Sequence, residues 1–209
     1  MNQENIRDRF LHTLDHIERT AGKLEPLTGM RKDQPLRFAD LHKLSEGLFL
    51  ASWTDWEEFL RELFIEDLAT DASGALRREV KVFRTKRASW RLADSIVGHP
   101  DAAKWIEWSE YAAVKGRADS LLGAGNRFSS AAINQENLAR LKRIRNAIAH
   151  KSDHAWESFK DLARQTPFSL SDMRGITVGR FLVAHEWNGH TVLRESLTIL
   201  QSNARALVP

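Results

Sequence analysis

The sequence predicts an all-α protein, and three observations support this prediction. Apolar residues recur every three or four positions over most of the chain, which is the period of a helix buried along one face. Runs of β-branched residues are short. Only 5 prolines occur in 209 residues, so long helices can form without interruption.

The N-terminal part is predicted to contain two helices. The first covers residues 3–21 and ends before Gly22. A loop follows over residues 27–35. The second helix spans residues 40–70, where the apolar period continues without a helix breaker other than Gly47. A helix of about 30 residues is about 45 Å long at 1.5 Å per residue, so it is a candidate scaffold for the fold and for a dimer.

The sequence allows more than one prediction for the middle of the chain. Residues 71–99 form the most basic segment, which includes Arg84 and Arg87. Two interpretations of this segment remain open. It is either a solvated loop with a short helix or an arm that contacts phosphate. A helix is predicted over residues 100–114. Three aromatic residues at helical spacing support this helix, and we interpret them as core residues: Trp105, Trp108 and Tyr111.

The C-terminal part is predicted to alternate helices and turns. Asn134 is a typical N-cap, and basic residues gather toward His150, which matches the helix dipole. An Asn-Gly pair at 188–189 predicts a turn and leaves a small β-ribbon around residues 180–195 open. The expected order is a helix over 134–150, a turn at 151–153, a helix over 153–164, a segment over 174–181 and a closing helix over 191–207.

Composition excludes several function classes. Cysteine is absent, so a disulfide framework, a cysteine-ligated zinc site and a thiol nucleophile are excluded. No run of about 18 apolar residues occurs and the first 20 residues are charged throughout, so we expect a cytoplasmic protein with no membrane partner. The net charge of +3 permits a nucleic-acid partner without requiring one. No phosphate-cradling glycine loop is found, and we expect no cofactor.

The candidate chemistry lies in residues 141–156, LKRIRNAIAHKSDHAW, where four residues separate Arg145 from His150. This spacing alone is not specific, because three other pairs share it: Arg7/His12, Arg37/His42 and Arg180/His185. The intervening Asn-Ala-Ile-Ala and the basic helix before it distinguish this pair. Histidine pairs at helical spacing, such as His150 and His154, have no third ligand nearby, so we expect no metal site.

A helical projection places these residues on different faces. Leu138, Leu141, Ile144 and Ile148 form an apolar stripe, and Arg143, Asn146 and His150 lie opposite it. Arg145 falls inside the stripe, so it needs a carboxylate partner or an open cleft. Arg145 and His150 can reach one phosphate only if the helix ends or bends near Ala149, or if a second chain completes the site. The structural alternative is a helix-end histidine beside an ion-paired arginine.

Arg-Asn-Ala-Ile-Ala-His resembles the Arg-x4–6-His signature of the HEPN superfamily (higher eukaryotes and prokaryotes nucleotide-binding). Two further segments are similar to the RiboL-PSP-type branch of that superfamily: Trp56-Glu57-Glu58-Phe59-Leu60, and Thr177-Val178-Gly179-Arg180-Phe181-Leu182 with valine in place of a proline. The resemblance covers residues 40–207 and leaves the first 35 residues unexplained.

The resemblance implies a HEPN-like helical bundle with a long second helix and a helical C-terminal extension, forming a single domain over residues 1–209. It further implies a homodimer in which two motifs face each other across a cleft. Such a dimer acts as a metal-independent endoribonuclease.

By position, the resemblance makes Arg145 and His150 the catalytic pair, Asn146 an auxiliary polar residue and Glu57 an acidic partner from the long helix. Glu58 and Asp55 are rivals for the acidic role. Histidine, with a reference pKa near 6.5, can move the proton of a ribose 2′-hydroxyl, and arginine can stabilise charge on the phosphoryl group. Six basic residues are expected to bind RNA: Arg140, Lys142, Arg143, Lys151, Arg84 and Arg87.

The resemblance also suggests a biological role as a toxin or anti-phage effector, with an antitoxin or defence-system partner. The alternative keeps the fold and drops catalysis, giving an inactive RNA-binding or assembly module. A DNA-binding regulator would require a basic recognition helix within residues 75–90.

Overall fold

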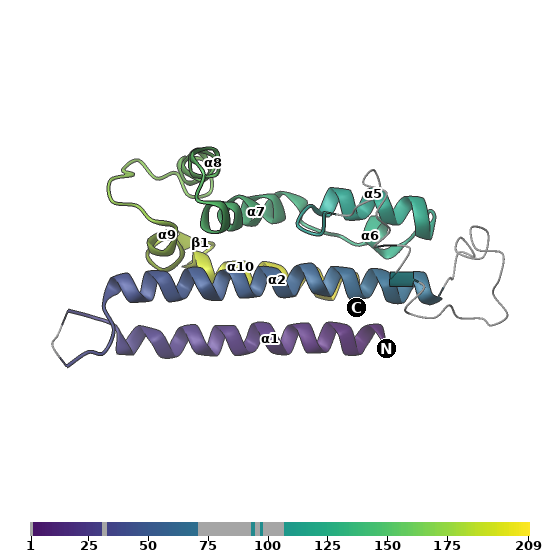
Figure 1. Cartoon of the computed structure of the whole chain (residues 1–209), viewed down its shortest axis with the longest axis horizontal. Helices are drawn as coiled ribbons and strands as arrows, with labels where there is room; N and C mark the ends of the chain where they lie inside the picture. Colours follow the sequence, from purple (N-terminus) through teal and green to yellow (C-terminus); the bar gives the residue numbers. More distant parts are fainter. Residues whose placement is uncertain (1, 31–32, 71–92, 95–96, 98–106) are drawn as a thin grey trace. The chain divides into compact units, whose positions relative to one another are not determined.

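A computed structural model describes residues 2–30, 33–70, 93–94, 97 and 107–209, and this part of the chain is all-α, as predicted (Figure 1). Apart from one two-stranded hairpin, its regular elements are helices. They are α1 (Gln3–Leu24), the 3₁₀ turn η1 (Glu25–Leu27), α2 (Phe38–Thr70), α5 (Tyr111–Leu122), α6 (Arg127–Ser130), α7 (Gln135–His150), α8 (Asp153–Arg164), α9 (Val178–Ala184) and α10 (Val192–Leu207), and the hairpin pairs β1 (Glu186–Trp187) with β2 (His190–Thr191). No helix of this part of the chain is both long and apolar enough to cross a membrane.

Most predicted helices are present close to their predicted bounds. The long helix α2 has 33 residues and tolerates Gly47, where an added Cβ would meet no atom within 4 Å. The small β-ribbon also forms. Its turn residues Asn188 and Gly189 have φ values of 53° and 80°, and positive φ at both positions is what a tight two-residue hairpin turn requires.

The predicted helix over residues 100–114 is wrong at residues 107–110, whereas residues 111–114 are helical. Residues 107–110 form a turn, and α5 starts only at Tyr111 and continues to Leu122. Glu110 has extended backbone, with φ −113° and ψ 101°, so no helix can run through it. Trp108 has its helical spacing by coincidence and packs its ring edge-on against Phe64.

The chain divides into two compact units, each of which is described by itself. Unit 1 contains Met1–Phe10, Trp56–Gln135 and Asn203–Pro209. Unit 2 contains Leu11–Asp55 and Glu136–Ser202.

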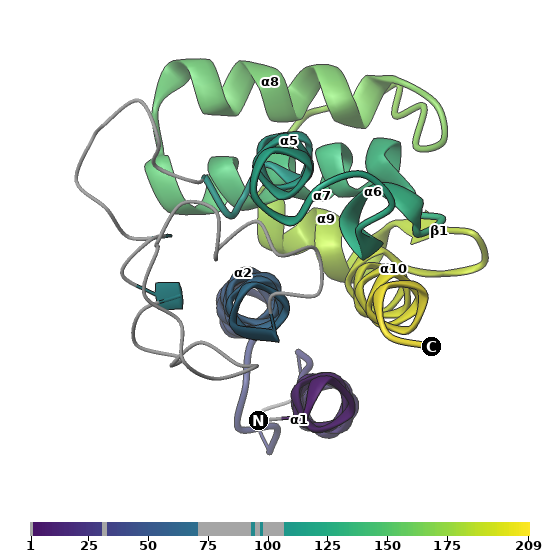
Figure 2. The ribbon, with the colours of Figure 1, turned by 90° about the vertical axis from the view of Figure 1, so that its right-hand side faces the viewer.

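Unit 2 is organised around an aromatic row that links α8, α9 and the hairpin. The ribbons of α8 and α9 are labelled in Figure 2. Phe159 of α8 meets Phe181 of α9 edge-on, with ring centroids 5.2 Å apart. Phe168 then bridges Phe181 and Trp187, at centroid distances of 4.9 and 5.1 Å. Edge-to-face pairs of this kind stabilise beyond their buried area. The row therefore fixes the position of α8, the element that follows the candidate site.

Helix α9 approaches the unit 2 part of α2 very closely, and Gly179 makes this possible. Its N–H donates to Glu46 Oε1 at 3.0 Å, and a Cβ added to Gly179 would overlap the carbonyl oxygen of His42. Thr177 caps the same helix, because its hydroxyl accepts from the N–H of Arg180 at 3.1 Å. The Thr-Val-Gly segment thus has a structural explanation in capping and packing.

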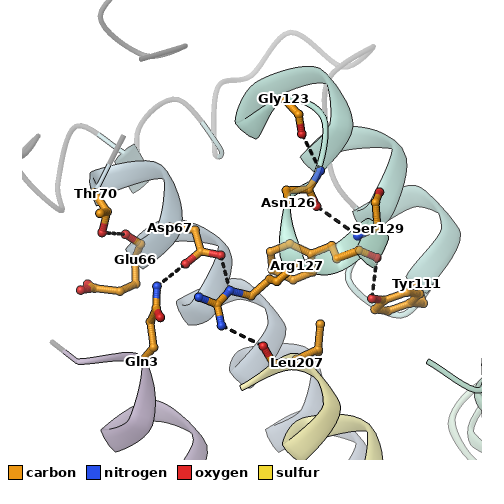
Figure 3. Close-up of polar contacts among 11 residues, drawn as sticks. Gln3, Glu66, Asp67, Thr70, Tyr111, Gly123, Asn126, Arg127, Ser129 and Leu207 are labelled. Atoms are coloured by element: carbon orange, nitrogen blue, oxygen red, sulfur yellow. Dashed lines mark hydrogen bonds and ion pairs between the residues drawn. The ribbon is translucent and has the colours of Figure 1, made fainter. Parts of the chain in front are cut away.

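Unit 1 combines an aromatic cluster with a polar one. Phe10, Trp56 and Phe59 pack together, with the rings of Phe10 and Phe59 stacked at 4.9 Å. In the polar cluster, Asp67 accepts from Arg127 Nε at 2.7 Å and from the Gln3 side chain at 2.6 Å (Figure 3).

Burial raises the pKa of Asp67, although the charge of Arg127 opposes that shift. Arg127 also donates to the carbonyl of Leu207 at 2.8 Å. The polar cluster therefore connects α1, α2, α6 and α10 within unit 1.

Candidate active site

The candidate site forms at the C-terminal end of α7, which buries the apolar face that the sequence predicts. The buried residues are Leu138, Leu141, Ile144, Ala147 and Ile148. The helix ends at His150, because Lys151 has φ 47° and cannot continue it. Ser152 then starts α8 as its N-cap and accepts from the N–H of Ala155 at 3.2 Å. The helix end near residue 149 that the sequence argument requires is therefore present.

Arg145, Asn146 and His150 come together at this helix end, and we call them the Arg145 cluster. Arg145 Nη1 donates to Asn146 Oδ1 at 3.2 Å and lies 3.0 Å from His150 Nε2. Arg145 and Asn146 are half-buried and His150 is exposed, so the cluster is open to solvent. A helical projection places Arg145 on a different face from the other two residues. Its side chain still reaches them, because the helix ends at His150 and the arginine side chain is long.

The contact between Arg145 and His150 restricts the tautomer of the neutral imidazole. A guanidinium has only hydrogen-bond donors. Nε2 of His150 must therefore be the acceptor, and its proton must be on Nδ1 in the neutral ring. The cluster thus holds a lone pair on Nε2 next to a permanent positive charge.

The acidic residues predicted to accompany Arg145 have different surroundings. Glu57 is a half-buried residue of α2 in unit 1, whereas the cluster belongs to unit 2. Glu58 is exposed and pairs with Arg61 at 3.1 Å. Asp55 belongs to unit 2, where burial raises the pKa of its half-buried carboxyl.

The predicted RNA-binding residues differ in their side-chain contacts and in their exposure to solvent. Arg143 donates from Nε and Nη2 to the carbonyl oxygen of Ser158, which ties α7 to α8. Arg140 is held by Asn137 and by an ion pair with Glu136. Lys142 is half-buried and Lys151 is exposed, whereas Arg84 and Arg87 lie outside the described residues together with most of the basic segment.

A cavity of about 420 Å³ in unit 2 involves Lys151, which was predicted to bind RNA, and also Trp156 and Lys43, for which the sequence argument gave no role. Its lining includes Ala147, Ile148, Lys151 and Trp156 from the neighbourhood of the cluster, and Lys43 from α2. Trp156 follows His150 by six positions, which is the only sequence signal that could have linked it to the site. The contribution of Lys43 depends on long-range packing that no local pattern reveals.

Two further findings concern metal binding and similarity to known proteins. Within the described ranges, no group of three histidine or acidic residues is arranged to hold a metal ion. Comparisons with protein-family models, curated proteins and solved structures find no match to this chain.

Proposed function

We propose that this chain is a metal-independent endoribonuclease of the HEPN type, with Arg145 and His150 as its catalytic pair. The observation that carries the proposal is the 3.0 Å distance between Arg145 Nη1 and His150 Nε2. A guanidinium and an imidazole so close together, at a solvent-exposed helix end, can contact a single phosphodiester. The Arg-Asn-Ala-Ile-Ala-His resemblance gives the same assignment.

The chemistry begins with the imidazole as a general base. With an RNA bound, Nε2 of His150 takes the proton of a ribose 2′-hydroxyl, and the 2′-oxygen attacks the adjacent phosphorus. The new bond joins phosphorus to the 2′-oxygen, and the bond to the 5′-oxygen breaks. The protonated imidazole returns a proton to the leaving 5′-oxygen. The products are a 2′,3′-cyclic phosphate and a 5′-hydroxyl.

Arg145 and Asn146 stabilise this reaction by hydrogen bonding. The guanidinium of Arg145 turns from Nε2 to the non-bridging phosphate oxygens, where charge accumulates. Oδ1 of Asn146 holds the guanidinium, as it does at 3.2 Å in this structure, and its amide N–H groups remain available for the phosphate. In the proposed homodimer, a second copy of the chain supplies another Arg145–His150 pair to the same cleft.

The direct test is cleavage of labelled single-stranded RNA in the presence of excess EDTA. The wild-type chain should cut, and His150→Ala and Arg145→Ala should each lose about 10²–10⁴-fold in rate. His16→Ala is the matched control, because His16 is an exposed histidine on α1. A His150→Ala chain as active as wild type would refute the assignment.

The product analysis tests the role of the 2′-hydroxyl. A substrate with a single 2′-deoxyribose at the cleaved position should resist cutting there, and the product ends should carry a cyclic phosphate. Cleavage of DNA, or activity that appears only with added divalent metal, would contradict this mechanism.

The alternative is an inactive RNA-binding or assembly module. One observation favours it: the contacts of Arg145 with Asn146 and His150 would also stabilise the helix end without any catalysis. RNA that binds the wild-type chain and stays intact at high protein concentration would select this alternative.

We propose a toxin or anti-phage role for the active form, on the strength of the resemblance alone. Expression of the wild-type chain in a bacterium should arrest growth, and Arg145→Ala should relieve the arrest at equal protein level. Light scattering should give the mass of a dimer. Normal growth with abundant wild-type protein would count against the toxin role.

A further inference from the structure

The cavity of about 420 Å³ in unit 2 shares its wall with the end of α7. Ala147 and Ile148 of that wall lie between Arg145 and His150 in the sequence, and Lys151 follows His150 directly. Lys151 and His150 are consecutive residues, so their Cα atoms are about 3.8 Å apart. An extended ligand at the Arg145 cluster that passes Lys151 would therefore reach the lining of the cavity.

One side of the cavity is apolar and includes an oriented aromatic ring. Ile148 and Val178 are buried, and Trp156 is half-buried. The ring of Trp156 packs on Phe159 of the same helix, with centroids 5.3 Å apart, and this contact restricts its orientation. A fixed indole beside aliphatic side chains is suited to a flat aromatic ligand, because every nucleobase can stack on such a ring.

Two lysines and two acidic residues line the cavity. Lys151 is exposed and makes no ion pair or hydrogen bond among the described residues. Lys43 is 72% exposed and pairs with Glu46 at 2.6 Å. The carboxylate of Glu46 is engaged on both oxygens, by Lys43 and by the N–H of Gly179, which leaves Asp153 as the other acidic residue of the lining. The unpaired ammonium group of Lys151, in a lining that also contains an aromatic ring, suits a ligand with an aromatic ring and a phosphate.

We infer that this cavity holds the base of the nucleotide next to the phosphodiester that Arg145 and His150 contact, with Trp156 as its stacking partner and Lys151 on the adjoining phosphate. This inference rests on the proposed function, since it places single-stranded RNA at the Arg145 cluster. The cavity volume falls within the range of about 300–1,000 Å³ that small-molecule sites occupy, so one base with its ribose can enter.

Binding must be measured separately from cleavage, so the probe is a single-stranded RNA oligomer with a 2′-O-methyl group on every ribose. This oligomer cannot be cut by attack of its own 2′-oxygen. Fluorescence anisotropy with the full chain should show binding that Trp156→Leu weakens about tenfold or more, because stacking on an aromatic ring is lost. Trp156→Phe should stay within about threefold of wild type, since phenylalanine also stacks.

A Lys151 variant tests the phosphate contact, and its result does not depend on whether the Trp156 variants fold. Lys151→Ala should lower the slope of log affinity against log salt concentration by about one. Arg164→Ala is the control, because it removes an exposed cation at the other end of α8 and should leave the slope unchanged. An unchanged slope in Lys151→Ala would remove this residue from the interface.

Abasic substitution then tests stacking by a double-mutant cycle. Removing one base at a time from the oligomer should identify one position where the wild-type chain loses affinity. At that position the loss should be absent in Trp156→Leu, because the two changes remove the same contact. Full additivity of the two changes at every position would show that Trp156 stacks on no base.

The outcomes separate this inference from the proposed function. Loss of binding in a folded Trp156→Leu chain supports the base-binding cavity, even if ordinary RNA is never cut. Suppose that cleavage depends on His150 but that RNA binding is unchanged in the Trp156 and Lys151 variants. This result would refute the base-binding role of the cavity and support the nuclease activity. A wild-type chain that binds no oligomer would also refute the base-binding role of the cavity.

Discussion

At the scale of single residues, the arrangement of Arg145 and His150 determines which ring nitrogen can accept a proton. Because the guanidinium donates to Nε2, the neutral ring carries its proton on Nδ1. The nitrogen that faces Arg145 is thus the one that can serve as a base. Sequence reasoning singles out both residues as candidates. It could not predict their contact, because a helical projection ignores the length and flexibility of an arginine side chain.

The tautomer itself can be measured. Nitrogen NMR of the wild-type chain at neutral pH should show His150 predominantly with a proton on Nδ1. Arg145→Ala should lose this preference, because no donor then faces Nε2. A wild-type ring protonated mainly on Nε2 would contradict the contact.

Gly179 is a second residue whose role appears only in three dimensions. It donates to Glu46, 133 positions away, and leaves no room for a side chain beside His42. Gly179→Ala should therefore lower the free energy of unfolding by about 1–3 kcal/mol, because overpacking displaces α9 from α2.

Gly47→Ala is the matched control, since its Cβ would meet no atom within 4 Å and a helical alanine should raise stability by about 0.5–1 kcal/mol. Urea denaturation of both variants gives the comparison. Equal stability of Gly179→Ala and the wild-type chain would mean that α9 can move away without loss.

At the scale of elements, two half-buried histidines, His42 and His185, should make the junction of α9 with α2 sensitive to acid. Burial and the charge of Arg180 lower the pKa of His42 and of His185, and Glu46 only partly opposes this shift for His42. In the unfolded chain each ring titrates near its ordinary value of 6.5. Between the lowered pKa and 6.5 the unfolded chain binds more protons, so stability is lost as the pH falls through that window.

This sensitivity should depend on Arg180. Urea unfolding at pH 7.5 and pH 5.5 should show a smaller difference in Arg180→Gln than in the wild-type chain, because one of the two causes is removed while burial remains. Arg164→Gln, which removes an exposed arginine from α8, should keep the wild-type difference. The same difference in all three chains would exclude Arg180 as a cause.

Elements were predicted well where amphipathic periodicity and capping residues agree. Helix α8 is an example: Ser152 caps it, and its buried face contains Ala155, Phe159 and Leu162. The failure at residues 107–110 has a physical reason. Aromatic residues keep helical spacing there, but the extended backbone at Glu110 and the contact of Trp108 with Phe64 are decided by packing.

At the scale of the whole molecule, the two compact units combine distant segments of the sequence. Unit 1 draws on Met1–Phe10, Trp56–Gln135 and Asn203–Pro209. A single sequence contains no signal for such pairing, because its local patterns describe one helix at a time. The fold class and the helix that carries Arg145 and His150 were predictable, whereas the cavity and the polar cluster around Asp67 were not.

The polar cluster should account for part of the stability of unit 1. Arg127→Ala leaves the Asp67 carboxylate with Gln3 alone, so the free energy of unfolding should fall by about 3 kcal/mol. Adding Asp67→Asn should recover part of this loss, because a neutral amide does not need a cation. Chemical denaturation measures both, with Arg205→Ala, an exposed residue of α10, as the control. A stable Arg127→Ala chain would show that water replaces the guanidinium.

One contact of unit 1 has a consequence for protein engineering. Arg7 donates to the carbonyl oxygens of Val208 and Pro209, at 3.0 and 2.9 Å, so the start of α1 lies beside the end of the chain. A circularly permuted version, with residue 209 joined to residue 2 through a short glycine-serine linker, would need little added length. New termini could be opened in the exposed stretch 171–172, which would leave Arg145 and His150 on an uncut helix.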